Sequence, residues 1–199
     1  MQLADMAGML RIMLVDETAA RSFYLRLVLE EIGYRVVAEV SAARELHDAV
    51  LRLSPDVIIV DTESPSRDTL EHLCLLTESC PRPIVMFSQD ASRDSIREAV
   101  RSGVSAYVVD GMSPGRINPI VEAAVARFEA FQAVRSELSD VKSMLSERKL
   151  VEKAKGILMK SRSISEDEAY RALRKLAMDK KQRLADIARQ VIALADLLA

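Results

Sequence analysis

Apolar positions in the first half of the chain fall into short clusters that are separated by longer segments of mixed polarity. Five clusters are rich in β-branched residues and have strand length: Arg11–Val15, Arg35–Val40, Asp56–Val60, Pro83–Phe87 and Ala106–Val109. The segments between them have a helical period, as at Ala19–Ile32, where Leu25, Leu29 and Ile32 share one side. Strands that alternate with helices predict an α/β fold with a doubly wound, five-stranded parallel sheet.

The second half of the chain has a helical period and no strand pattern. Its apolar residues recur at alternating steps of four and three, with one extra step of three after Phe128. They are Ile117, Val121, Ala124, Phe128, Phe131, Val134, Leu138, Val141 and Leu145. This heptad spacing predicts a coiled-coil helix, and no Gly or Pro interrupts residues 120–155. An exposed apolar stripe on such a helix predicts a homodimer. The alternative is a single helix that folds back on the preceding domain.

Two further helices are predicted after the coiled coil, and together with its end they form a three-helix module. The chain turns around Ser161–Ile164. Ser165–Glu168 has the sequence of a capping box that opens a second helix. Asp179–Gln182 repeats that pattern ahead of a third helix, which ends at Leu198. Apolar positions on all three helices are sufficient for a small core.

The charge of the chain is divided between its two parts. The 199 residues fit two domains, and the net charge of −2 taken alone argues against a simple polybasic nucleic-acid binder. However, residues 1–147 hold 15 Lys and Arg against 23 Asp and Glu, a net of −8. Residues 148–199 hold 13 against 7, a net of +6, and the first lysine in the chain is Lys142. An acidic domain is therefore followed by a basic one.

Several classes of protein are disfavoured by the sequence. No apolar run approaches the ~18–20 residues that a membrane span needs. Met1–Gly8 lacks the basic and apolar regions of a signal peptide, so we expect a cytoplasmic protein with no membrane contact. Cys74 and Cys80 are six residues apart with no clustered His, which fits neither a zinc site nor a disulfide framework.

Polar side chains collect where the predicted strands end, which is where ligands bind in parallel sheets. The first strand ends in Asp16 and Glu17, the third in Asp61 and the fourth in Ser88, and the fifth runs into Asp110. An Asp after a strand is often only a helix N-cap. Three carboxylates from two strand ends, however, suit Mg²⁺, which would offset the charge of a phosphorylated aspartate.

These residues resemble the receiver domain of response regulators over residues 10–115. The matching motifs are Met13–Glu17, Pro55–Asp61, Pro65, Asp68, Ser88 and Tyr107. The resemblance implies four Mg²⁺ ligands, namely Asp16, Glu17, Asp61 and the backbone carbonyl of Glu63. It also implies that Asp61 is the phosphoacceptor and that Ser88 and Tyr107 are the switch residues.

One residue departs from the receiver pattern. That pattern has a lysine three residues after the switch aromatic, whereas this chain has Asp110 there and no lysine before Lys142. A phosphoaspartate adds nearly two negative charges, and here a like charge replaces the cation that would pair with them. We therefore expect a pseudo-receiver that acts as a docking and dimer-positioning module. The alternative is a phosphorylation-dependent two-component regulator that acts on DNA promoters.

The basic part of the chain carries its cations in order. At about 100° per residue, one helix face carries Lys149, Lys153 and Lys160 and another carries Arg171, Arg174 and Lys175. The candidate RNA-binding residues are Arg148, Lys149, Lys153, Lys155, Lys160, Arg171, Arg174, Lys175, Lys180, Lys181 and Arg183. A polar helix face is often merely solvated, but two stripes without an acid favour a polyanion site. The last helix is too apolar for base reading in DNA, and aromatic platforms are absent, which leaves structured RNA.

The basic part resembles the ANTAR domain, the three-helix RNA-binding module of transcription antitermination regulators. The matching segments are Glu147–Lys149, Ala154–Met159, Ser165–Tyr170, Leu173–Met178 and Leu184–Ile192. The expected organisation is a receiver-like domain at 10–115, a coiled-coil linker helix at 116–147 and an ANTAR domain at 138–199.

Within this group the chain resembles NasT-type nitrate/nitrite regulators. The segments that carry this resemblance are Ile59–Asp68, Arg82–Phe87, Gly103–Tyr107 and Ala126–Phe128. The resemblance implies a regulator that is not an enzyme and has no cofactor besides Mg²⁺. It would bind stem-loops in the nascent leader RNA of nitrate/nitrite assimilation genes, and a nitrate-sensor protein would control it.

Overall fold

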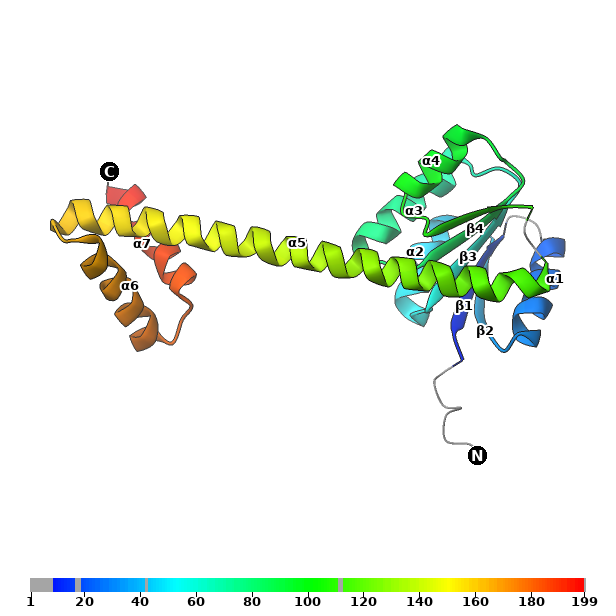
Figure 1. The fold of residues 1–199 in the computed structure, drawn as a ribbon, viewed down its shortest axis with the longest axis horizontal. Helices are drawn as coiled ribbons and strands as arrows, with labels where there is room; N and C mark the ends of the chain where they lie inside the picture. The colour runs from blue at the N-terminus through cyan, green and yellow to red at the C-terminus, as the bar shows by residue number, and fades with distance from the viewer. Residues whose placement is uncertain (1–8, 17–18, 42, 111–112, 199) are drawn as a thin grey trace, which may run out of the picture. The chain divides into compact units, whose positions relative to one another are not determined.

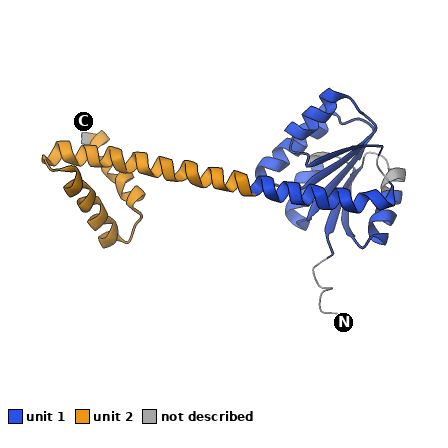
Figure 2. Ribbon diagram, in the orientation of Figure 1, with its two compact units in different colours: residues 1–132 blue, residues 133–199 orange. Residues whose placement is uncertain are grey.

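The computed structural model of the chain describes residues 9–16, 19–41, 43–110 and 113–198. Met1–Gly8 and Glu17, for which the sequence made predictions, lie outside the described residues. The chain forms two compact units, residues 1–132 and 133–199 (Figure 2). The boundary between them lies within helix α5 (Pro114–Arg162), so this helix contributes residues to both units.

The first unit contains a five-stranded parallel sheet (Figure 1). Its strands are β1 (Arg11–Asp16), β2 (Arg35–Val40), β3 (Val57–Thr62), β4 (Ile84–Ser88) and β5 (Ala106–Val109). The strand order is β2-β1-β3-β4-β5, and all neighbours are parallel. This architecture confirms the predicted fold class. The central strand β3 is buried along its whole length, as expected for a continuous apolar run in a doubly wound sheet.

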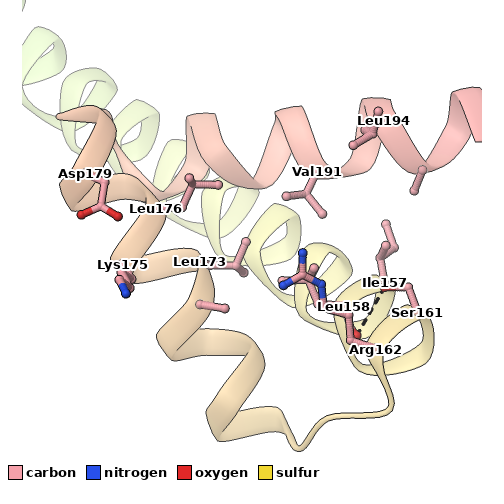
Figure 3. A pocket seen from close by; sticks show the side chains of 12 residues that line it. Ile157, Leu158, Ser161, Arg162, Leu173, Lys175, Leu176, Asp179, Val191 and Leu194 are labelled. Carbon is pink, nitrogen blue, oxygen red and sulfur yellow. Dashed lines mark hydrogen bonds between the residues drawn. The ribbon is translucent and has the colours of Figure 1, made fainter.

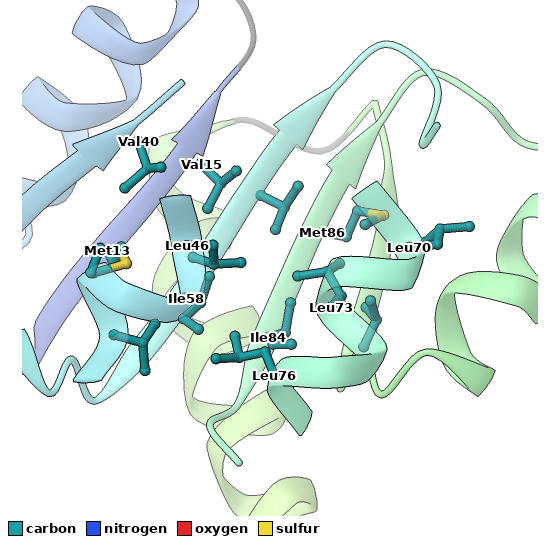
Figure 4. Packing of buried hydrophobic residues seen from close by; sticks show 14 of the residues in the cluster. Met13, Val15, Val40, Leu46, Ile58, Leu70, Leu73, Leu76, Ile84 and Met86 are labelled. Carbon is teal, nitrogen blue, oxygen red and sulfur yellow. The ribbon is translucent and has the colours of Figure 1, made fainter. Parts of the chain in front are cut away.

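Helices cover both faces of the sheet. Those between the strands are α1 (Ala19–Glu31), α2 (Ala43–Leu53), α3 (Arg67–Ser79) and α4 (Arg93–Arg101). Successive strand residues point to opposite faces. Ile58 therefore joins the cluster that contains Leu46 of α2 and Leu73 of α3 (Figure 4). Ile59 joins the opposite cluster, which contains Leu29 of α1 and Val121 of α5.

Serine N-caps begin the two helices that follow β3 and β4. The Ser66 hydroxyl accepts a hydrogen bond from the Thr69 N–H at 3.1 Å, which begins α3. The Ser92 hydroxyl accepts one from the Ser95 N–H at 3.2 Å, which begins α4. Each cap satisfies one of the backbone donors that the first helical turn leaves open. The caps also fix the loops that carry the polar residues at this end of the sheet.

The second unit is a three-helix module made of the end of α5, α6 (Glu166–Lys180) and α7 (Leu184–Leu198). Its buried core consists of Ala154, Leu173, Ala177, Ile187, Ala188 and Ile192. The predicted capping box at the start of α6 is present. The Ser165 N–H donates to the Glu168 carboxylate at 2.9 Å, and the Glu168 N–H donates to the Ser165 hydroxyl at 3.3 Å.

The second predicted capping box is wrong. Asp179 lies inside α6, which continues to Lys180, and α7 begins only at Leu184. Lys181 has a left-handed backbone with φ of 52°, and its N–H bonds to the Met178 carbonyl at 3.1 Å. Residues 179–182 therefore encode the C-terminal cap of one helix and not the N-terminal cap of the next.

The predicted heptad stripe of α5 divides into a buried and an exposed part. Ile117, Val121 and Ala124 are buried in the first unit, where they pack with residues of α1 and the sheet. The later members are exposed, with exposed fractions of 63% for Phe131, 63% for Val134, 51% for Leu138, 51% for Val141 and 54% for Leu145. Only the later part of the stripe is therefore available to a partner. Over the described residues, no helix combines the length and apolarity that a membrane crossing requires.

Candidate functional site

Two carboxylates lie side by side at the carboxyl ends of the central strands. Asp16 ends β1 and Asp61 belongs to β3, and the two are register partners across the parallel pair. Both are buried, with exposed fractions of 7% and 2%. We call them the acidic pair. The two predicted acids are therefore brought together, at the edge of the sheet where doubly wound folds bind ligands.

The acidic pair fits Mg²⁺ by its chemistry. Mg²⁺ prefers oxygen ligands and is commonly held by one or two carboxylates together with waters and phosphate oxygens. Asp16 and Asp61 would hold the ion, which would offset the charge of a phosphoryl group on Asp61. The third predicted acid, Glu17, lies outside the described residues. Within the described ranges, no group of three or more His, Cys, Asp or Glu is arranged to hold a metal.

The predicted ligand on Glu63 is its backbone carbonyl, and the structure uses that carbonyl in another way. It accepts a hydrogen bond from the Ser88 hydroxyl at 3.1 Å and one from the Gln89 N–H at 3.2 Å. A carbonyl oxygen has two lone pairs, and both are used here. Coordination of a metal by this oxygen would therefore require the Ser88 hydroxyl to move, which leaves that role a prediction. The two hydrogen bonds join the loop after β3 to the loop after β4.

Asp90 is the centre of a hydrogen-bond network that the sequence reasoning missed. Its carboxylate accepts hydrogen bonds from the Ser95 hydroxyl at 2.6 Å, the Ser92 N–H at 2.8 Å and the Ser64 hydroxyl at 3.1 Å. These bonds lower the pKa of the Asp90 carboxyl to about 2 from its ordinary value of 3.8, and the bond from Ser95 has the largest effect. The Asp90 N–H donates to the Ser88 hydroxyl at 3.1 Å. The sequence signal was present as an Asp among closely spaced serines between a strand and a helix.

Both predicted switch residues are bound to this network. Ser88 is buried, and its hydroxyl bridges the Asp90 N–H and the Glu63 carbonyl. Tyr107 on β5 donates its hydroxyl hydrogen to the Asp90 carbonyl oxygen at 2.7 Å. The switch hydroxyl and the switch aromatic are therefore both anchored through the backbone of Asp90. We call the set Ser64, Ser88, Asp90, Ser92, Ser95 and Tyr107 the Asp90 network.

Asp110 takes the place of the receiver lysine at the end of β5. The residue is exposed, and its backbone is left-handed with φ of 49°. Its N–H donates to the Ser88 carbonyl at 3.3 Å, which continues the pairing of β5 with β4 by one residue. Asp is one of the residue types that tolerate this conformation, so the substitution is compatible with the turn. Its charge has the sign of the acidic pair and not the opposite sign.

Ten of the eleven candidate RNA-binding residues of the second unit are exposed, and one is buried. The exposed members are Arg148, Lys149, Lys153, Lys160, Arg171, Arg174, Lys175, Lys180, Lys181 and Arg183. On α6, Arg171 and Arg174 are exposed, whereas Leu173 and Ala177 are buried in the core. Arg183 is already paired, with its guanidinium 3.2 Å from Asp186 and 3.5 Å from Glu147. We call the other nine exposed members the cationic face.

Lys155 is the exception, because it lies inside the module. Its side chain is only 9% exposed, and its ammonium lies 2.9 Å from a Glu152 oxygen and 2.6 Å from a Glu166 oxygen. The bonds to Glu152 and Glu166 raise the pKa of Lys155, and Lys155 lowers the pKa of Glu166. The ion pair joins α5 to the first turn of α6. The helical period of the sequence did not indicate that Lys155 is buried. The period gives the face on which a lysine lies, and not whether glutamates of another helix enclose it.

Comparisons with protein families assign both units. The family model of the response regulator receiver domain matches residues 12–122, and that of the ANTAR domain matches residues 139–192. The transcriptional regulatory protein PdtaR of Mycobacterium tuberculosis (strain ATCC 25618 / H37Rv) is 30% identical over 189 residues. That alignment covers 95% of this chain and 92% of PdtaR. The chain therefore belongs to the response regulators. Within them, it belongs to those that carry an ANTAR domain after the receiver.

Two further similarities are partial. The nitrate regulatory protein of Klebsiella oxytoca is 46% identical over 66 residues, which covers 33% of this chain and 17% of that protein. A solved structure of a LuxR-family two-component response regulator from Aurantimonas sp. SI85-9A1 matches with a TM-score of 0.53 and 28% identity. It covers 60% of this chain and 86% of that one. The first unit therefore has the fold of solved receiver domains.

The Asp90 network predicts a stability difference that depends on pH. The pKa of Asp90 is lowered on folding, so its contribution is fully present above the unfolded value of 3.8 and is lost as pH falls towards 2. We expect Asp90→Asn to destabilise the first unit by an amount that is constant above about pH 5 and shrinks between about pH 4 and pH 2. Urea denaturation at a series of pH values measures this. Asp94→Asn, which makes the same chemical change at an exposed position in the first turn of α4, is the control. A difference that is independent of pH would contradict the assignment.

We expect removal of Lys155 and removal of its two glutamate partners to lower the stability of the second unit by unequal amounts. Glu152 and Glu166 are 55% and 65% exposed, so without Lys155 they stay solvated. Lys155→Met keeps the packing of the stem and should be nearly neutral. The double change Glu152→Gln and Glu166→Gln leaves a buried ammonium without a carboxylate and should lower the Tm clearly more. Thermal unfolding followed by circular dichroism decides the order. A larger loss in Lys155→Met would refute this description of the pair.

Proposed function

We propose that the chain is a transcription antitermination regulator that binds stem-loops in nascent leader RNA through its ANTAR domain. The observation that carries the proposal is the cationic face on the module that the ANTAR family model matches. The nine lysines and arginines of this set are exposed to solvent, in a part of the chain with a net charge of +6. Phosphates neutralised by such a face release counterions, which favours binding of a nucleic acid.

Structured RNA is favoured over duplex DNA by the arrangement of α7. A helix that reads bases in the major groove needs several exposed polar side chains. Helix α7 instead buries Ala185, Ile187 and Ala188 in the module and exposes Leu194 and Leu197. The module also has a single aromatic residue, so stacking of an extended single strand is not supported. A module with exposed cations and few base-reading side chains is suited to recognise the charge and shape of a folded RNA.

The receiver domain is proposed to take its signal from a protein partner. Asp110 replaces the cation that would pair with a phosphorylated Asp61, and the Asp90 network already holds Ser88 and Tyr107 in place. A sensor protein that docks on this domain can release or expose the ANTAR module without phosphoryl transfer. The second candidate function is phosphorylation-dependent control of DNA promoters, which the acidic pair itself favours because it would hold Mg²⁺.

Nitrate/nitrite assimilation is the proposed target, with a nitrate-sensing protein as the partner. Its support is the resemblance of segments between Ile59 and Phe128 to nitrate/nitrite regulators. The 46% identity to the nitrate regulatory protein of Klebsiella oxytoca over 66 residues adds to this. Binding of the chain to leader RNA from a nitrate assimilation operon, compared with an unrelated leader, tests this part separately.

Charge reversal on α6 tests RNA binding. The probe is an RNA stem-loop that the full chain selects from a library with a constant stem and a random loop. Arg171→Glu together with Arg174→Glu should lower its affinity by about 10²-fold and reduce the slope of log K against log salt, because phosphate contacts are lost. Fluorescence anisotropy at several salt concentrations measures both quantities.

The matched control is Arg97→Glu with Arg101→Glu, which makes the same charge change at exposed positions of α4 in the first unit. It should leave RNA affinity within about twofold. Unchanged affinity in the α6 double variant would show that the assigned face is wrong. Duplex DNA that competes as well as the stem-loop would favour the second candidate function.

A homodimer through the exposed part of the α5 stripe is also proposed. Val134, Leu138, Val141 and Leu145 are each more than half exposed and follow heptad spacing. Apolar residues in this pattern are stabilised by burial against an identical helix.

Leu138→Glu should convert the dimer to a monomer, because it places a charge in the proposed seam. Ser139→Glu, at the exposed neighbouring position, is the control and should leave the dimer intact. Sedimentation equilibrium distinguishes the two states, and far-UV circular dichroism verifies that the helix is retained. A wild-type chain that sediments as a monomer at all concentrations would refute the seam.

A further inference from the structure

A groove of about 700 Å³ opens on the second unit, between the end of α5, α6 and α7 (Figure 3). Its walls are apolar and include Ile157 and Leu158 of α5, Leu173 of α6, and Val191 and Leu194 of α7. Leu194 is 60% exposed although it lines this groove. An apolar surface of this kind gains free energy when an apolar group covers it.

The groove also has polar groups. Arg162 of α5 and Lys175 of α6 line it, together with the Ser161 hydroxyl and the Asp179 carboxylate. Within the described ranges, neither of these two cations has a salt bridge, and both are exposed. The groove therefore suits a ligand with a flat apolar body, an anionic group beside it and hydrogen-bond donors on its edge. A nucleotide of an RNA loop has this combination of groups.

We propose that this groove receives an unstacked nucleobase from the loop of the bound RNA. The aliphatic walls enclose the faces of the base, and Arg162 and Lys175 contact the phosphates that flank it. Asp179 accepts a hydrogen bond from an amino group on the base edge, and the Ser161 hydroxyl, which donates to the Leu158 carbonyl at 3.4 Å, accepts a further one. The inference rests on the proposed function and adds to it a subsite for one base.

The positive charge around the groove makes a nucleotide a better occupant than a helix from a second copy of the chain. Two cations line the groove, and the half of the chain that contains it has a net charge of +6. The proposed dimer seam ends at Leu145, before the first groove residue, Ile157, so the groove does not continue it. The subsite would also allow the protein to distinguish one base from another. Contacts to the RNA backbone cannot do this, because they position a protein without reading sequence. The single aromatic of the module, Tyr170, does not line the groove, so the groove would hold a base between aliphatic side chains.

A double-mutant cycle between the groove and the RNA tests the proposal. The probe is the selected stem-loop, with each loop nucleotide replaced in turn by an abasic site. Leu194→Ser is the groove variant, and its exposure means that little packing is lost. Leu197→Ser, on the same helix but 82% exposed and outside the groove, is the matched control. Affinities of the full-length chain are measured by fluorescence anisotropy, and thermal unfolding verifies that each variant is folded.

The expected result is coupling at one loop position. There, the abasic RNA and Leu194→Ser should each lose about tenfold in affinity, and together they should lose about tenfold and not a hundredfold. Leu197→Ser should show neither effect. Asp179→Asn should change which base is preferred at the same position, because a carboxylate that only accepts becomes an amide that also donates.

Three outcomes would overturn the subsite. If the affinity losses of Leu194→Ser and of the abasic RNA multiply at every loop position, no base of the loop binds in the groove. Abasic RNAs that all bind like the parent show that no base is read. A Leu194→Ser variant with altered sedimentation and unaltered RNA affinity makes the groove a contact between copies of the chain. In each case the parent RNA still binds, so these failures differ from failure of the proposed function, in which the wild-type chain selects no RNA at all.

Discussion

The structure depends on helix α5, which takes part in two separate hydrophobic cores. Near its start, Ile117, Val121 and Ala124 are buried with α1 and the sheet. Near its end, Ala154 is buried with α6 and α7. The receiver domain and the ANTAR domain each need this helix to cover apolar surface, so neither core is complete without it. Between the two cores the helix keeps an apolar stripe that its own chain does not cover. The proposed homodimer would bury this stripe.

The receiver domain has the geometry of a phosphoacceptor site without its usual cation. Asp16 and Asp61 are in register and buried, so the strands themselves place the two carboxylates that would hold Mg²⁺. The residue in the lysine position carries a negative charge, and the switch residues are held by the backbone of Asp90. These features together favour a domain whose conformation is fixed from within and read by a partner. The ANTAR domain then holds the output, with its cationic face and the apolar groove on the same three helices.

The period of apolar residues was sufficient to predict the sheet, the helix order and the helical module. The five strands agree within one residue at nearly every end, because doubly wound strands are continuous apolar runs. The sequence could not place Asp179, since a carboxylate in the last turn of a helix and one at the N-cap of the next have the same local pattern. It also placed Lys155 on the surface, because burial of a lysine depends on two glutamates that tertiary packing supplies. The run of serines around Asp90 is a local signal, but the contacts of Asp90 with Ser64 in the loop after β3 and with Tyr107 on β5 depend on the tertiary fold.

Under the proposed function, the unphosphorylated chain binds structured RNA, and Asp61 does not control this binding. The most direct test is the affinity of the full chain for its selected stem-loop with and without acetyl phosphate and Mg²⁺, in wild type and in Asp61→Asn. We expect one affinity in all four cases, with the same dependence on salt. RNA binding that appears only after treatment with acetyl phosphate, and is lost in Asp61→Asn, would contradict it.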